Sequence, residues 1–130
     1  MLNLYFRNFG DAPAKNLRIV AHIVQSQMDR EGEDEVFYQL YNDMAELEQN
    51  KSKDIGKDVG LGESFFITAK GKPLTDEEWQ KVQTGEMPLY IVALLKYADR
   101  DGQRTTEYCT FYWGDDPNRF IYCNGHNRTD

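Results

Sequence analysis

Alternating apolar and polar side chains predict β-strands in the first part of the chain. Leu2, Leu4 and Phe6 are separated by single residues, the period of a strand with one buried face. Leu17, Ile19, Ala21 and Ile23 repeat this alternation, and a third short apolar segment follows a turn that contains two glycines. We therefore expect three strands, over residues 2–7, 17–24 and 64–68.

The strongest strand signal lies in the second half of the chain. Residues 88–98 are apolar at odd and even positions alike, which is typical of a strand covered on both faces. Residues 105–113 are rich in Thr, Tyr, Phe and Trp, which favour strands, and residues 120–123 follow a turn at 114–118. We expect 88–98 to be the central strand, with 105–113 and 120–123 as successive hairpin partners.

Two segments have helical signals instead. Val36, Phe37, Leu40, Met44 and Leu47 recur with a helical period, which predicts an amphipathic helix over residues 34–48. Acidic residues precede this helix, and we interpret them as a solvated face, with an acidic docking surface as the alternative. A second, short helix is expected after Thr75, because Glu78 has the spacing of a capping box and Gly85 is placed to end it.

Together these elements predict a mainly β fold. Six short strands with hairpin links indicate a two-sheet antiparallel β-sandwich, with one or two short helical insertions. A chain of 130 residues can bury a core of its own, so we expect residues 1–130 to form a single domain.

Composition and charge restrict the classes of function. The formal net charge is −7 and the pI is about 4.8, which opposes binding to nucleic acid and to anionic lipid surfaces. The longest mostly apolar run, residues 89–95, is far shorter than the roughly 20 residues of a membrane-spanning helix. We expect no nucleic-acid partner, and contact with a membrane only through an anchor absent from this sequence.

Cys109 and Cys123 flank the turn at 114–118 at equal distances from residue 116. If the hairpin is symmetric about that residue, the two cysteines face each other as a non-hydrogen-bonded pair about 4.5 Å apart, within reach of a disulfide. We therefore predict a disulfide, which implies an oxidising compartment. Two buried free thiols are one alternative, and a metal site of Cys109, Cys123 and His126 is another, less favoured because it lacks a fourth close ligand.

Candidate catalytic groups are few. The two histidines, His22 and His126, are the expected general bases, but neither has an evident partner in the sequence. We expect His22 on the outward face of its strand and His126 in a polar tail, and we interpret both as structural. Ser64 lacks the glycine pattern of a nucleophile elbow, and Asp99 and Asp101 belong to a turn without the spacing of a calcium loop. The sequence predicts no catalytic residue, no bound metal and no cofactor.

The last predicted hairpin is rich in aromatic residues. Some of these side chains must point outward if the strands alternate, and Tyr108, Tyr112 and Tyr122 are the candidates for an exposed aromatic binding face. Such a face could bind an oligosaccharide or a partner protein. The favoured alternative is that a helix covers this face, because aromatic residues are common in cores.

Several short motifs resemble a family of bacterial membrane-anchored proteins without assigned function. In their order along the chain they are Asn8-x-Gly10-x-x-Pro13-Ala14, Leu61-Gly62-Glu63-Ser64, Leu74-Thr75-x-x-Glu78, Thr106-x-x-Cys109 and Cys123-x-x-x-Asn127. The resemblance implies an immunoglobulin-like, cell-adhesion-related sandwich on the extracytoplasmic side of the membrane. It also implies that this sequence is the soluble part of a longer, anchored protein, and it carries no known activity.

These observations favour a noncatalytic, periplasmic or surface-exposed module that binds a partner or has a structural role. One alternative is a small hydrolase, which a pocket lined by His22 or His126 beside a carboxyl group of strongly shifted pKa would support. The other is a cytoplasmic assembly or ligand-binding domain that uses the acidic helix, in which Cys109 and Cys123 would be free thiols.

Overall fold

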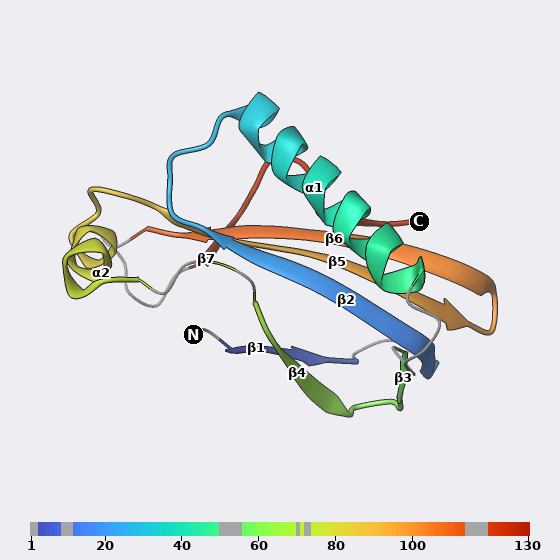
Figure 1. The fold of residues 1–130 in the computed structure, drawn as a ribbon. Helices are drawn as coiled ribbons and strands as arrows, with labels where there is room; N and C mark the ends of the chain where they lie inside the picture. The colour runs from blue at the N-terminus through green and yellow to red at the C-terminus, as the bar shows by residue number, and fades with distance from the viewer. Residues whose placement is uncertain (1–2, 9–11, 50–55, 70, 72–73, 114–119) are drawn as a thin grey trace.

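A computed structural model describes residues 3–8, 12–49, 56–69, 71, 74–113 and 120–130 (Figure 1). The predicted turn at 114–118 lies outside these residues. The elements in chain order are β1 (Asn3–Arg7), β2 (Ala14–Val24), α1 (Arg30–Gln49), β3 (Lys57–Val59), β4 (Ser64–Thr68), α2 (Asp76–Gln83), β5 (Leu89–Asp99), β6 (Gly102–Tyr112), β7 (Phe120–Tyr122) and β8 (Arg128–Thr129).

The strands form two antiparallel sheets. The larger sheet has the order β3-β2-β5-β6-β7, with β8 also paired to β6, and the smaller one pairs β1 with β4. Helix α1 lies across one face of the larger sheet, and the β1–β4 pair lies against the other face (Figure 1). The predicted class, a mainly β protein with antiparallel sheets and two helices, is confirmed. The immunoglobulin-like assignment stays a prediction.

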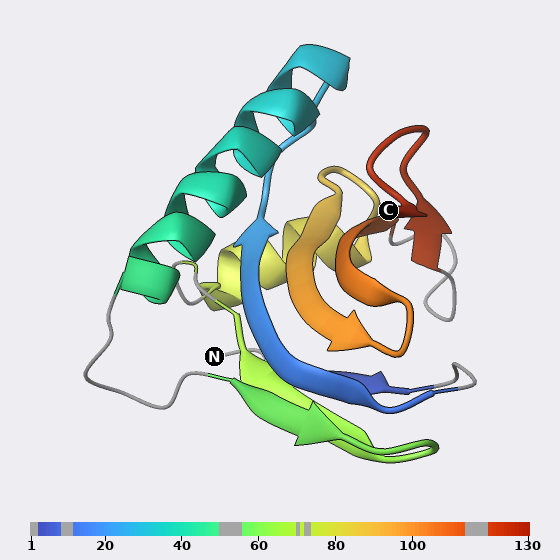
Figure 2. The same ribbon diagram turned by 90° about the vertical axis from the view of Figure 1, so that its right-hand side faces the viewer.

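Strand β5 is central, as its pattern predicts. It pairs with β2 on one side and β6 on the other, and all of residues 89–94 are buried. Alternate side chains of β5 enter two separate cores. Tyr90, Val92 and Leu94 pack with Phe37, Leu40 and Met44 of α1, whereas Ile91 and Ala93 pack with Leu4 of β1 and Ala21 of β2. Figure 2 shows β2, β5 and β6 bending together along their length.

Both predicted helices are present. Helix α1 begins at Arg30, four residues before the predicted start, because Asp29 caps it by accepting a 2.8 Å hydrogen bond from the Gly32 N–H. It covers 20 residues, so it is a full layer of the fold and not a short insertion. In α2 the capping box is complete, since the Thr75 hydroxyl accepts from the Glu78 N–H at 3.1 Å and Glu78 Oε1 accepts from the Thr75 N–H at 3.4 Å.

Two short strands were not predicted, and two strands begin earlier than predicted. β6 begins at Gly102, three residues before the predicted start at 105, because Asp99 pairs with Gly102 at the end of the hairpin. β3 and β8 have three and two residues, too few for a period of two to be visible in the sequence. β2 begins at Ala14, three residues early, and its register shifts between Ala14 and Leu17, where Asn16 has a positive φ of 51°. This irregularity interrupts the alternation of apolar side chains that marks the rest of the strand.

Candidate functional site

A cavity of about 730 Å³ lies where the first turns of α1, strand β6 and the segment joining β7 to β8 meet. Its walls are mainly charged and amide side chains, contributed by elements far apart in the sequence. They include Asp29, Arg30, Glu33, Asp34, Glu107, Asn124, His126, Asn127 and Arg128. We call it the His126 cavity.

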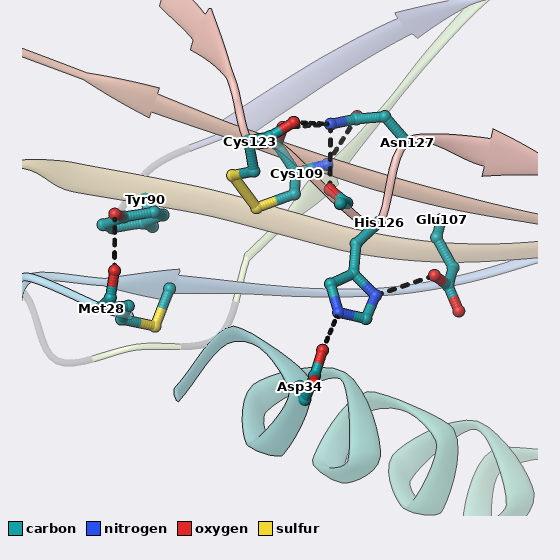
Figure 3. Close-up of a disulfide and its surroundings, with 9 residues drawn as sticks. Met28, Asp34, Tyr90, Glu107, Cys109, Cys123, His126 and Asn127 are labelled. Atoms are coloured by element: carbon teal, nitrogen blue, oxygen red, sulfur yellow. Dashed lines mark hydrogen bonds and ion pairs between the residues drawn. A yellow bond between two sulfur atoms is a disulfide. The ribbon is translucent and has the colours of Figure 1, made fainter. Parts of the chain in front are cut away.

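The His126 imidazole is held between two carboxylates (Figure 3). Its Nδ1 lies 2.9 Å from Glu107 Oε1, and its Nε2 lies 2.5 Å from Asp34 Oδ1. The ring also stacks on Phe37, with centroids 4.1 Å apart and an interplanar angle of 5°. His126 has a left-handed backbone conformation, with φ of 59°, and its side chain lines the cavity. Each ring nitrogen therefore faces a carboxylate oxygen.

Glu107 is a buried carboxylate with several donors around it. The Tyr41 hydroxyl donates a 2.6 Å hydrogen bond to Oε2, and Arg128 Nε lies 3.5 Å from Oε1. Burial alone would raise the pKa of Glu107, but hydrogen bonds from Tyr41 and His126 outweigh it and hold that pKa below its usual range. Burial and the bond to Glu107 raise the pKa of Tyr41 to about 12.

Glu33 differs from the other carboxylates of the cavity, because its side chain lines the cavity without a hydrogen-bond partner among the described residues. Its residue is 9% exposed, and its side chain makes no hydrogen bond or ion pair in the part of the chain that the structure describes. Burial raises its pKa, although the nearby His126 acts in the opposite direction. Glu33 is one of the acidic residues before the helix predicted over residues 34–48, which we expected to be a solvated face, and for this residue that expectation is wrong. The sequence did contain a signal for this position, because Glu33 lies one turn before Phe37 and therefore on the buried stripe of α1.

The predicted pairing of Cys109 with Cys123 is present as a disulfide, with Cα atoms 5.5 Å apart. Both residues are buried, at 0% and 7% exposure. The expected spacing of about 4.5 Å is wrong, because the pair is hydrogen-bonded: the Cys123 N–H donates to the Cys109 carbonyl at 3.0 Å. Since the sulfurs are bonded to each other, the alternative metal site of Cys109, Cys123 and His126 does not form in this state.

Asn127 replaces a missing strand partner beside the disulfide (Figure 3). Its Oδ1 accepts a 2.9 Å hydrogen bond from the Cys109 N–H, and its Nδ2 donates to the Cys109 carbonyl at 2.8 Å. The side-chain amide therefore pairs with both backbone groups of Cys109, in the interval between the pairings of β7 and β8 with β6. It fixes the segment that carries His126.

His22 also has a partner that the sequence did not reveal. Its Nε2 lies 2.7 Å from Asp43 Oδ2 of α1. The expected outward position is wrong, whereas a hydrogen-bonded imidazole agrees with the structural role that we expected. The neighbouring Val20 and Val24 pack on the same core as α1, which explains why this face of β2 is covered. Next to this pair, Glu48 of α1 faces Arg18 and Lys96, at 3.5 and 3.3 Å. These ion pairs hold the second half of α1 to the sheet.

The candidate aromatic face lies on the side of the sheet opposite α1. Tyr122 is 65% exposed, and its ring meets Tyr108 edge to face with centroids 6.1 Å apart. Tyr108 in turn meets Phe6 of β1 in the same geometry, at 6.2 Å. Alternation along β6 places Tyr112 on this face as well. The favoured expectation that a helix covers the face is wrong for Tyr108, whose neighbour is a strand of the smaller sheet.

A smaller, more apolar cavity of about 300 Å³ lies between the two sheets, far along β5 from the disulfide. Phe6, Leu17, Val59, Phe65 and Leu95 contribute its apolar walls. It shares no lining residue with the His126 cavity.

Comparisons with known proteins give no relative from which function could be transferred. No family model matches the chain, and neither a curated protein nor a solved structure is significantly similar to it. The family resemblance therefore stays a prediction. Neither described helix is long and apolar enough to cross a membrane.

Proposed function

We propose that this protein is a noncatalytic binding or structural module that works outside the cytoplasm, as the extracytoplasmic part of a membrane-anchored bacterial protein. The observation that carries the proposal is the disulfide between Cys109 and Cys123, buried where α1 meets the sheet. Disulfides persist in oxidising compartments and are rare where thiols are kept reduced. The resemblance to anchored bacterial sandwich domains points to the same compartment.

The positions of the two histidines support a noncatalytic role. A general base needs a ring nitrogen that can reach the substrate, and both nitrogens of His126 face carboxylates. His22 Nε2 is likewise within hydrogen-bond distance of Asp43. Among the interactions of the described residues, neither imidazole is paired with a serine, threonine or thiol that could act as a nucleophile.

The expected partner is a protein or an oligosaccharide. Tyr108, Tyr112 and Tyr122 support this part of the proposal, because aromatic rings with exposed faces are suited to stacking against sugar rings or apolar side chains. Tyr122 is the most exposed of the three, at 65%. A Tyr122→Ala variant should therefore weaken partner binding without a large change in stability.

The oxidation state of the cysteines in the native host tests the compartment. Free thiols in fractionated cells are blocked with an alkylating reagent before any reduction, and the intact protein is then weighed. We expect unmodified Cys109 and Cys123 in the extracytoplasmic fraction. Protein in the cytosolic fraction with both cysteines alkylated would overturn the proposal in favour of a cytoplasmic assembly or ligand-binding domain.

The His126 cavity favours one second candidate, a small hydrolase. His126 Nδ1 contacts the buried Glu107 as a catalytic base contacts the group that orients it, and Nε2 would be freed if the exposed Asp34 side chain turned away. Chromogenic esters and glycosides distinguish the two candidates. Turnover by the native protein that is lost in both His126→Gln and Glu107→Gln would establish the hydrolase. Equal background rates in all three proteins support the noncatalytic module.

A further inference from the structure

The unpaired Glu33 carboxylate, which lines the His126 cavity, is the feature of this cavity that the fold does not explain. The core-facing stripe of α1 consists of Phe37, Leu40 and Met44, and Glu33 continues it by one turn toward the disulfide. Its carboxylate lies within 4.8 Å of both disulfide sulfurs, which offer only weak acceptors. An apolar residue would continue the stripe without the cost of removing a charged group from part of its water.

The groups around Glu33 do not neutralise it within the protein. His126 has the largest lowering effect on the pKa of Glu33, but both nitrogens of that ring face Glu107 and Asp34. Arg30 also lowers the pKa of Glu33, with a smaller effect than His126, whereas the negative charges of Asp29 and Asp34 raise it. From the sheet, the neighbouring Tyr90 donates its hydroxyl proton to the Met28 carbonyl and not to Glu33. A cation from outside would therefore find an unpaired carboxylate at the inner wall of the cavity.

The arrangement of oxygen atoms favours an organic cation over a metal ion. A hard divalent cation needs several oxygen ligands converging on one point. In the described part of the chain, the group of metal donors that converges within 4.8 Å contains one carboxylate, Glu33, with two sulfurs that are bonded to each other. An ammonium group, by contrast, is satisfied by one carboxylate and neutral acceptors, and forms short, charge-assisted hydrogen bonds.

The volume of the cavity and its other lining groups indicate what kind of molecule carries this ammonium group. About 730 Å³ is within the range of small-molecule sites, and it exceeds what a simple alkylammonium ion would fill. Asp29, Asn124 and Arg128 line the cavity with carboxylate, amide and guanidinium groups. These groups donate to and accept from hydroxyls, so the walls suit a polyhydroxyl body better than an apolar one.

We propose that the His126 cavity binds an amino sugar with a free amine, whose ammonium group pairs with Glu33. The inference rests on the proposed function in one respect, that the protein is a binding module, and it names the class of ligand. The free-amine requirement follows from Glu33, the one acidic side chain without a hydrogen-bond or ion-pair partner among the described residues that line the cavity, since an acetylated amine carries no charge to neutralise it.

The test is isothermal calorimetry on the purified, oxidised chain with glucosamine, and with N-acetylglucosamine as the matched neutral sugar. We expect glucosamine to bind at least tenfold more tightly. The Glu33→Gln variant should lose this preference, while Glu31→Gln, an exposed acidic neighbour outside the cavity, should keep it. A residue with a purely structural role would not show this combination.

A second measurement on the native chain avoids dependence on the variant. Carbon NMR of the Glu33 carboxyl should show its pKa falling when glucosamine is bound, because the ammonium favours the ionised form. Equal binding of the two sugars, no binding of either, or a Glu33 carboxyl that does not respond to glucosamine would each overturn the inference. None of these results would change the oxidation state measured for Cys109 and Cys123 in fractionated cells. The amino-sugar inference can therefore fail while the proposed compartment stands, and the two failures are distinguishable.

Discussion

Tyr41 of α1 and Glu107 of β6 are joined by a 2.6 Å hydrogen bond across the interface between the helix and the sheet. The two residues are 66 positions apart in the sequence. Glu107 is 4% exposed, and its other oxygen faces His126 and Arg128. This contact therefore links α1, β6 and the C-terminal segment through one buried carboxylate.

Removing the Tyr41 hydroxyl should destabilise the protein. Tyr41→Phe keeps the ring but leaves a buried oxygen of Glu107 without its donor, and such a loss costs about 1 to 3 kcal/mol. Urea unfolding followed by circular dichroism measures the change. Tyr38→Phe is the matched control, since Tyr38 is on the same helix and 67% exposed, and its free energy of unfolding should stay within about 0.5 kcal/mol of the native value. Equal effects of the two substitutions would contradict a role for the buried bond.

The Tyr41 hydroxyl should stabilise the folded protein at neutral pH, and this stabilisation should be lost at strongly alkaline pH. The pKa of Tyr41 is raised from its ordinary value of 10.0 to about 12 in the folded protein, so the folded state favours the protonated phenol. This contribution is fully present below pH 10 and disappears as the pH rises through about 12. The difference in free energy of unfolding between the native chain and Tyr41→Phe should therefore shrink over this interval. A difference that stays constant from pH 9 to pH 12 would contradict the raised pKa.

Glu107 should give stability that is lost in acid. Its pKa is held below the ordinary value of 4.5, so the folded state favours the carboxylate. The contribution is present above pH 4.5 and is lost as the pH falls through the lower, folded-state pKa. Comparing urea midpoints of the native chain and Glu107→Gln from pH 7 downward checks this. The two midpoints should converge only below pH 4.5, and convergence at higher pH would contradict the prediction.

Much of the fold could be predicted because its signals are local. The alternation in 17–24, the two-sided apolar run in 88–98 and the capping box at Thr75 each depend on residues close together in the sequence. The hairpin symmetry about residue 116 likewise brought Cys109 opposite Cys123. We predicted a non-hydrogen-bonded pair for the two cysteines, which was wrong. Whether two opposite residues form a hydrogen-bonded pair depends on the register of the strands, and an equal distance from the turn does not determine it.

The candidate site was missed because its contacts are long-range. His126 is 92 positions from Asp34, and no periodicity links a residue in a polar tail to the first turn of a helix. Similarly, His22 meets Asp43 only because α1 lies over β2. Glu33 is the exception, since extending the apolar stripe of α1 back by four residues from Phe37 would have placed a carboxylate on the buried face.

Asn127 should hold the C-terminal segment in place through backbone groups of Cys109. In Asn127→Ala the Cys109 N–H loses its acceptor while remaining buried, which should cost about 1 to 3 kcal/mol. Hydrogen exchange gives a direct readout, because the Cys109 amide should lose protection. Asn124→Ala is the control, an exposed asparagine in the same segment. An unchanged exchange rate at Cys109 in Asn127→Ala would show that another group, such as water, satisfies this amide.

Removal of the disulfide should destabilise the fold without abolishing it. The bond closes a loop with a sequence separation of 14, for which the restriction of the unfolded chain is worth about 3 kcal/mol. Cys109 also lies at 0% exposure in the core beneath α1, so a double Cys→Ala variant would add a packing loss to the entropic one. Chemical reduction of the native chain separates the two effects, because both sulfur atoms stay in place. The urea midpoint should fall on reduction and fall further in the Cys109→Ala, Cys123→Ala variant. A reduced chain as stable as the oxidised one would show that the hydrogen bonds of Asn127, together with the packing of α1, hold this edge of the sheet without the covalent bond.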